Sequence, residues 1–182
     1  MKFEKKSIPD VIRVVPTVHV DARGFFMETW QSRQFADGGI DVGFVQDNFS
    51  SSSRGTLRGL HYQVEQAQGK LVRVVRGRVF DVAVDLRRSS KYFGKWVGEE
   101  LSAENKHQLW VPPGFAHGFL VLSESADFEY KCSDFYAPEH ERCIRWDDPD
   151  IGIEWPIDAG VHPVLSDKDA AAPSLSQADT YP

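Results

Sequence analysis

Apolar and polar side chains alternate with a period of two over much of the chain between residues 44 and 145. The clearest case is the run KLVRVVRGRVFDVAVDL, residues 70–86. Such alternation is typical of strands with one face toward a core, and it predicts two strands on either side of a turn at Arg76–Gly77. The second strand would place Val79, Asp81, Ala83 and Asp85 on one face and Phe80, Val82, Val84 and Leu86 on the other.

Further short strands follow this run, whereas helical signals are few. The expected strands are KWVGEEL, HQLWV, GFLVLS and DFEYKCSDFY, with turn signals between them. A short helix in WQSRQFADGG would stop at Gly38–Gly39, and single turns are expected in SAENKHQ and SDKDAAAPSLSQA. The pattern predicts an all-β jelly-roll sandwich or barrel, with a few short helices, as one domain over residues 1–182. Such a barrel can hold a small ligand in its mouth.

Composition and charge narrow the class of partner. The net charge of -6 argues against a nucleic-acid partner, although a few focused Arg and Lys can still attract a small anion. No apolar run is long enough to cross a bilayer, and the N-terminus lacks the apolar segment of a signal peptide. We therefore expect no membrane association and a cytoplasmic location. Cys132 and Cys143 fit neither a CxxC pair nor a zinc site, and we expect them to be reduced packing residues.

Three side chains are candidates for chemistry inside the barrel. His61, in RGLHYQ, is either a hydrogen-bonded core residue or a general base, because imidazole titrates near neutral pH. Lys70 alternates with Val72 and Val74. If these valines point inward, so does Lys70, and its ammonium must meet an anion or a developing negative charge; otherwise it is solvated. Tyr130, in FEYKC, is either a core aromatic residue or a general acid.

Two arginines and a second histidine suit ligand binding. Arg23, at a turn, and Arg58, at a strand entry, are either surface charges or a pair that grips a diphosphate at the barrel mouth. His117, in VPPGFAHGF, is a candidate metal ligand. The residue two positions after His61 is Gln63 rather than a second histidine, which weakens a metal site.

Five segments together carry a resemblance to a known family. They are DARGFFMETW, QDNFSSSSRGTLRGLHYQ, QGKLVRVVRGRVFDVAVDLRRSS, FGKWVGEELSAENKHQLWVPPGFAHGF and LSDKDAAAP. From about Phe3 to Ala172 the chain resembles the dTDP-4-dehydrorhamnose 3,5-epimerase (RmlC) family. The resemblance implies a cupin-type jelly roll that is normally a homodimer, acts on a dTDP-sugar and uses no metal or organic cofactor.

The resemblance also implies a role for each site residue. His61 would be the catalytic base, Asp169 the carboxylate that orients it, Tyr130 the acid on the opposite face of the sugar, and Lys70 the group that stabilises an enolate. The implied substrate-binding residues are Arg23, Phe26, Glu28, Gln46, Asp47, Asn48, Arg58, His117, Tyr136, Glu141 and Lys168.

The implied reaction inverts C3 and C5 of dTDP-4-dehydro-6-deoxy-D-glucose. Both carbons lie next to the C4 ketone, so loss of either proton gives an enolate that a lysine ammonium can stabilise. No redox step is needed, and no Gly-rich dinucleotide fingerprint is present. The alternatives are a 3-only or 5-only epimerase, a metal-dependent cupin, and a barrel that binds dTDP-sugars without catalysis.

Overall fold

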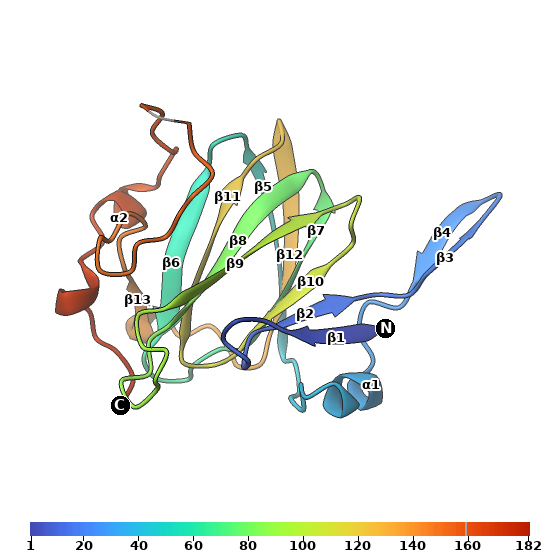
Figure 1. The fold of residues 1–182 in the computed structure, drawn as a ribbon, viewed down its shortest axis with the longest axis horizontal. Helices are drawn as coiled ribbons and strands as arrows, with labels where there is room; N and C mark the ends of the chain where they lie inside the picture. The colour runs from blue at the N-terminus through green and yellow to red at the C-terminus, as the bar shows by residue number, and fades with distance from the viewer. Residues whose placement is uncertain (159) are drawn as a thin grey trace.

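In the computed structural model, which describes residues 1–158 and 160–182, two antiparallel β-sheets pack face to face (Figure 1). The six-stranded sheet has the order β1 (Lys2–Lys5), β2 (Ile12–Val15), β10 (Gln108–Val111), β7 (Lys70–Arg76), β12 (Ser125–Cys132), β5 (Gln46–Ser53). The five-stranded sheet has the order β13 (Glu141–Cys143), β6 (Leu57–Gln63), β11 (Phe115–Val121), β8 (Arg78–Asp85), β9 (Trp96–Ser102). The predicted all-β jelly-roll class is confirmed.

Short elements complete the fold. They are the hairpin β3 (Val18–Asp21) and β4 (Gly24–Met27), the helices α1 (Ser32–Asp37) and α2 (Asp167–Ala170), and the 3-10 turns η1 (Pro138–His140) and η2 (Leu175–Gln177). The predicted end of the first helix is confirmed, because α1 ends at Asp37 with Gly38 as its C-cap.

The two strands predicted around Gly77 both form, but they belong to different sheets. β7 lies in the six-stranded sheet and β8 in the five-stranded sheet, so the chain crosses the sandwich at this glycine. Gly77 has a φ of 77°, and a Cβ atom there would lie 2.0 Å from the backbone oxygen of Ser125. Only glycine fits this corner. As a result, the inward faces of β7 and β8 look at each other across the core.

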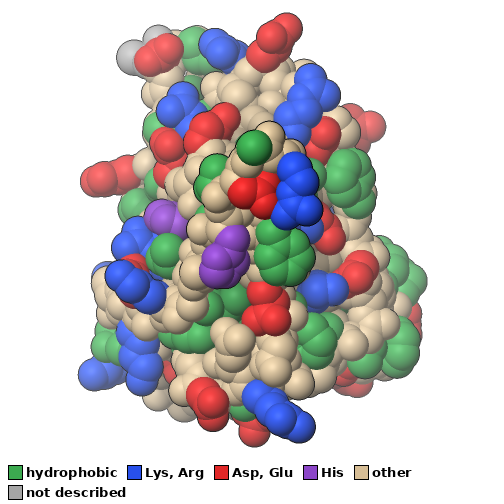
Figure 2. Space-filling view, turned by 90° about the vertical axis from the view of Figure 1, so that its right-hand side faces the viewer, with side chains coloured by type: hydrophobic (Ala, Val, Ile, Leu, Met, Phe, Trp, Pro, Cys, Tyr) green, Lys and Arg blue, Asp and Glu red, His purple; other side chains and the backbone are tan. Residues whose placement is uncertain are grey.

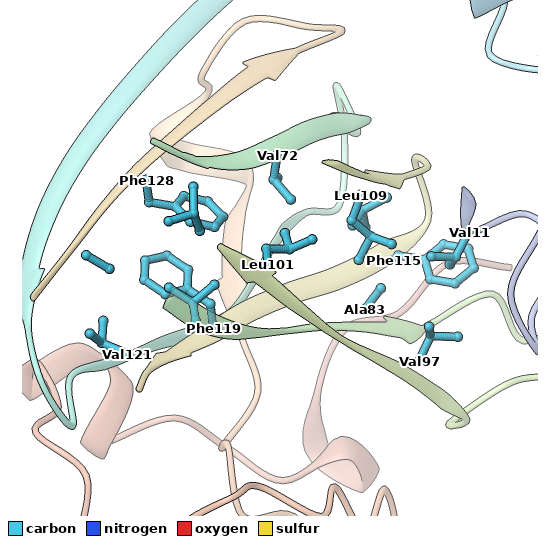
Figure 3. Close-up of a cluster of buried hydrophobic side chains, with 14 of the residues drawn as sticks. Val11, Val72, Ala83, Val97, Leu101, Leu109, Phe115, Phe119, Val121 and Phe128 are labelled. Atoms are coloured by element: carbon cyan, nitrogen blue, oxygen red, sulfur yellow. The ribbon is translucent and has the colours of Figure 1, made fainter. Parts of the chain in front are cut away.

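The core between the sheets is built from these inward faces (Figure 3). Val72 on β7 and Ala83 on β8 belong to the same buried cluster. Within this cluster the rings of Phe119 and Phe128 stack with centroids 4.2 Å apart. Since Lys70 lies two positions before Val72, the alternation of the strand also directs Lys70 inward.

The outer faces of the sheets are covered unequally. Over the five-stranded sheet, Ile151 and Leu175 of the C-terminal segment pack against Leu60 and Val82. On the six-stranded sheet, Phe35 of α1 joins a smaller cluster. This C-terminal covering brings α2 next to β6 and so places it close to the site described below.

The β3–β4 hairpin projects from the body of the molecule (Figure 1, upper right). Val20, Phe25 and Phe26 on this hairpin are 58–78% exposed. On the side from which it projects, apolar surface lies between interspersed charges (Figure 2). Unlike the hairpin, β2 has a hydrogen-bonded strand on both sides within the chain, β1 on one side and β10 on the other. None of the helices in the described part of the chain is both long and apolar enough to span a membrane.

Candidate active site

A cavity of about 240 Å³ lies between the sheets, at the end where β6 finishes and β7 begins. The six-stranded sheet contributes Gln46, Asn48, Lys70 and Tyr130 to its lining. The five-stranded sheet contributes His61, Tyr62, Gln63 and Glu141, and loops add Gln68 and Tyr136. The three side chains considered for chemistry from the sequence therefore line one cavity, from opposite walls.

Strand register explains the wall that carries Lys70 and Tyr130. Lys70 faces Cys132 across the β7–β12 pair, and Val72 faces Tyr130. Lys70 and Tyr130 are therefore diagonal neighbours on the same face of the sheet, which keeps long side chains within reach of each other. Asn48 on β5 is the next residue in the row, directly opposite Tyr130.

The opposite wall carries a histidine–carboxylate pair. Nε2 of His61 lies 2.5 Å from Oδ1 of Asp169, whose side chain is only 3% exposed. Asp169 is held by α2, where its backbone N–H donates to Oγ of the N-cap residue Ser166. Burial alone would raise the pKa of Asp169, but the contact with His61 lowers it below its usual value. An anionic partner on Nε2 leaves Nδ1 of His61 to accept a proton.

Lys70 places a cationic side chain in the cavity without an ion-pair partner. Across residues 1–158 and 160–182, no carboxylate oxygen lies within 4.0 Å of its Nζ. Burial lowers the pKa of Lys70, and Cys132, Glu141 and Asp81 oppose this effect. A desolvated ammonium group that no carboxylate contacts directly can stabilise negative charge on a ligand.

Tyr130 faces the cavity as a neutral phenol. Burial raises its pKa to about 12, and the positive charge of nearby Arg58 offsets only part of the rise. The hydroxyl group is therefore protonated at neutral pH and can donate a proton to a strong base such as a carbanion.

The cavity mouth is closed on one side by a hydrogen-bonded loop. The backbone N–H of Tyr136 donates to Oε1 of Gln46, and its hydroxyl group donates to Oε2 of Glu141, both at 2.9 Å. The same carboxylate forms an ion pair with Nζ of Lys168 at 2.5 Å. Burial would raise the pKa of Glu141, but Lys168 and Tyr136 lower it. The mouth thus combines an aromatic ring, an amide and an ion pair, a set that suits a polar ligand with a planar base.

No group of three His, Cys, Asp or Glu side chains with the spacing of a metal site occurs in the part of the chain that the structure describes.

Comparisons with known proteins agree with this geometry. The sequence model of the dTDP-4-dehydrorhamnose 3,5-epimerase family matches residues 5–177. The chain belongs to this family. The Pseudomonas aeruginosa dTDP-4-dehydrorhamnose 3,5-epimerase is 59% identical over the full length of both chains. A crystal structure of the Legionella pneumophila epimerase in complex with dTDP-4-keto-L-rhamnose is 52% identical, with a TM-score of 0.94, covering 98% of this chain and 94% of that one.

A more distant structural relative is a Streptomyces bikiniensis 3′-monoepimerase, crystallised in complex with dTDP-quinovose. It is 37% identical, with a TM-score of 0.88, covering 97% of this chain and 88% of that one.

Not every residue that matches the epimerase family lies in the cavity. Asp47 points to the outer face of the sheet, because it lies between Gln46 and Asn48 on β5, and it pairs with Lys131. Arg58 lies outside the cavity lining, with its Nε donating to Oγ of Ser52 at 3.0 Å. Within the single chain Asp47 therefore lies outside the cavity lining, and Arg58 lies at the rim.

His117, which the resemblance makes a substrate-binding residue, is a buried side chain in the single chain. It is 7% exposed, is not part of the cavity lining, and its Nε2 contacts both carboxylate oxygens of Asp81. It is nevertheless the direct cross-strand neighbour of His61. Asp81 was not predicted as a site residue, although it shares a strand face with Val79 and Ala83, which was a usable signal.

Arg23 and Phe26 of the hairpin, and Glu28 just after it, are absent from the cavity lining. Arg23 is paired with Asp21 on the hairpin and its side chain is 90% exposed. Glu28 accepts a hydrogen bond from Gln34 of α1. Arg23 and Arg58, which the sequence allowed either as surface charges or as a pair at one barrel mouth, do not meet within a single chain, since the hairpin leads away from the body (Figure 1).

Three lining residues were missed by sequence reasoning: Tyr62, Gln63 and the loop residue Gln68. Nε2 of Gln63 donates to the backbone oxygens of Gln66 and Phe135, and its Oε1 accepts from the N–H of Ala137. Strand alternation places Gln63 on the same face as His61, so its inward position could have been predicted.

Proposed function

We propose that the protein is a cofactor-independent epimerase that inverts C3 and C5 of dTDP-4-dehydro-6-deoxy-D-glucose to give dTDP-4-dehydro-L-rhamnose. One observation carries this proposal: His61, which is paired with Asp169 of α2, and Tyr130 come from opposite sheets and line one cavity, together with Lys70. Inversion requires a base on one face of the sugar ring and an acid on the other.

Each inversion proceeds in two proton transfers. Nδ1 of His61 takes the proton from the carbon next to the C4 ketone, and the electron pair of the broken C–H bond moves onto the C4 oxygen. The ammonium of Lys70 stabilises this enolate, an effect that can reach several kcal/mol in a preorganised site. Tyr130 then gives its proton to the opposite face of the same carbon. Exchange with solvent restores both groups.

The nucleotide part of the substrate is held at the cavity mouth. Tyr136 offers a ring for the base, while Gln46, Asn48 and the Glu141–Lys168 ion pair offer polar contacts. Arg58 at the rim supplies positive charge for the diphosphate. The dTDP-sugar in the Legionella relative supports this class of ligand.

The working form is a homodimer in the cytoplasm, in which the β3–β4 hairpin of each copy completes the pocket of the other. This accounts for a projecting hairpin whose apolar side chains are exposed in the single chain. It also brings the family residues Arg23, Phe26 and Glu28 to a pocket that they do not reach within their own chain. Each chain acts as one domain over residues 1–182.

Subunit mixing tests the shared pocket. Arg23→Ala and His61→Gln variants, each poorly active alone, should regain activity when they are unfolded and refolded together. In a mixed dimer, one pocket then combines the intact hairpin with the intact His61. A mixture no more active than its components would show that each pocket is built from one chain.

Deuterium exchange tests the reaction itself. The substrate is incubated with the protein in D2O, with and without EDTA, and C3 and C5 are followed by NMR. Deuterium at both carbons in the presence of EDTA is the expected result. Exchange at C3 or C5 alone would instead identify a monoepimerase, to which the Streptomyces relative is the structural parallel. Loss of exchange with EDTA would identify a metal-dependent enzyme, and no exchange a binding module.

A further inference from the structure

A second histidine–carboxylate pair lies inside the sandwich, outside the cavity lining. Nε2 of His117 lies 3.0 Å from Oδ1 and 2.9 Å from Oδ2 of Asp81. Asp81 is fully buried. His117 faces His61 in the register of β11 and β6, so the second pair is the immediate neighbour of the candidate base.

The contact between His117 and Asp81 is shared almost equally by the two carboxyl oxygens. Two nearly equal distances are what a single N–H group of His117 shared between two carboxylate oxygens would give. Within residues 1–158 and 160–182, no other hydrogen bond reaches the Asp81 carboxyl group. Burial raises the pKa of Asp81, while His117 and Lys70 oppose the rise. A buried carboxylate of this kind requires a positive charge nearby.

Lys70 is the cationic side chain whose charge favours the carboxylate form of Asp81. Four titratable or charged groups influence the pKa of Lys70 through their charge: Cys132 on β12, Glu141 on β13, Asp81 on β8 and Lys168 on α2. His61 and Tyr130 line the same cavity as Lys70.

The other anions near Lys70 or Asp81 are already neutralised. Glu141 is ion-paired with Lys168 at the cavity mouth. Glu99, which also acts on Asp81, is ion-paired with two cationic side chains from the N-terminal part of the chain. Burial raises the pKa of the Cys132 thiol, so it is neutral near pH 7. Asp81 is left as the anion that balances Lys70.

We propose that Asp81, oriented by His117, is the buried counter-anion that keeps Lys70 an ammonium ion in the empty pocket. This rests on the proposed function, because only a charged Lys70 can stabilise an enolate. Desolvation favours the neutral amine, whereas a fixed negative charge favours the ammonium. Asp81 is thus a positioning residue that acts through Lys70 and does not touch the substrate.

The same strand supplies a matched control. Asp85 is also fully buried and lies on the same face of β8, four positions along. Its carboxylate accepts hydrogen bonds from Arg87 and Ser90 instead. Burial would raise the pKa of Asp85, but these bonds lower it. Asp85→Asn therefore removes an equally buried charge without touching the Lys70 environment.

NMR titration of Lys70 tests the proposal without reference to activity. The full-length protein is labelled with lysine carrying ¹³C at Cε, and the Lys70 signal is assigned by its absence in Lys70→Met. In Asp81→Asn the Lys70 midpoint should move to lower pH by about one unit or more, the size expected for loss of a close opposite charge. In Asp85→Asn it should stay unchanged. Equal midpoints in the wild type and Asp81→Asn would overturn the proposal.

A measurement on the wild type covers the case in which Asp81→Asn fails to fold. The ¹³Cγ signal of Asp81 should report a carboxylate at pH 7, and a neutral acid would overturn the proposal. In steady-state kinetics, the fall of kcat at high pH should move to lower pH in Asp81→Asn, by the same amount as the Lys70 midpoint. KM should change less than about twofold. A protein that exchanges no deuterium would refute the epimerase function, and the Lys70 titration would still decide the role of Asp81.

Discussion

The two histidine–carboxylate pairs use the same chemistry in different surroundings. The His61 side chain is 29% exposed and lines the cavity, whereas the His117 side chain is 8% exposed and does not. Both histidines present Nε2 to an aspartate, and they face each other across β6 and β11. The two pairs therefore differ in role because only the His61 side chain is accessible from the cavity. The pair at the cavity can exchange a proton with a ligand, and the enclosed pair can act only through its charge.

Their partners also come from different distances along the chain. Asp81 lies 36 positions from His117, on the neighbouring strand of the sheet, while Asp169 lies 108 positions from His61, on α2. The enclosed pair is built into the sheet, and the open pair requires the C-terminal segment to fold back over it.

Replacing each histidine in turn is the strongest test of this comparison. His61→Gln should lower kcat by about 10³-fold, because general base catalysis contributes about 10²–10⁴. His117→Gln keeps an N–H donor for Asp81 and should cost about tenfold or less. Steady-state kinetics on the dTDP-sugar measures both. An equal loss in the two variants would show that His117 reaches the substrate and that the distinction between the pairs is wrong.

Lys70→Met should lower kcat by about 10²–10³-fold, since it removes the charge that stabilises the enolate. Binding of dTDP should change little. Lys131→Met is the matched control, because Lys131 lies on the outer face of the same sheet and pairs with Asp47. If Lys70→Met weakened dTDP binding while kcat was preserved, Lys70 would be a nucleotide contact.

Tyr130→Phe should lower product formation by about 10²-fold through loss of the acid. Removal of the proton by His61 would continue, so deuterium exchange into recovered substrate should fall much less than formation of the inverted sugar. The ratio of these two rates, measured by NMR in D2O, is the decisive quantity. An unchanged ratio would remove Tyr130 from the mechanism.

The loss of enzyme activity at high pH should follow the deprotonation of Lys70. The ammonium form exists below its pKa and is lost as pH rises through it, and burial lowers that pKa. Activity should therefore decline, by about tenfold per pH unit, starting below the ordinary lysine value of about 10.4. Tyr130 loses its proton only near pH 12. Tyr130→Phe should keep this loss at high pH, and its disappearance in this variant would assign it to the phenol.

The smallest effect is expected at Asp47. Its carboxylate is 60% exposed and pairs with Lys131 on the outer face of the sheet. Asp47→Asn should change KM by less than about twofold and the free energy of unfolding by less than about 1 kcal/mol, the usual range for exposed ion pairs. Both are measurable by kinetics and urea denaturation. A tenfold rise in KM would mean that Asp47 reaches the ligand.

The sequence by itself determined the strands and which way their side chains point. Alternation placed Asp81 and Ala83 on one face of a strand, and the structure confirms that this face is inward. The same argument covers Lys70, because each strand side chain is on the same face as those two positions away. These are local properties, set by backbone geometry and by the burial of apolar side chains.

Only the tertiary structure decided which inward residues meet. Gly77 sends β7 and β8 to opposite sheets, so the wall with Lys70 and the wall with His61 face each other across the cavity. Asp169 reaches His61 from the far end of the chain, and spacing alone cannot select it among 27 acidic residues. The sequence left open whether the hairpin with Arg23 reaches the mouth where Arg58 lies. In the single chain it leads away from that mouth, because its position depends on packing rather than on its own alternation. Long-range pairing is a property of the whole fold, since it is stabilised by contacts that no single segment contains.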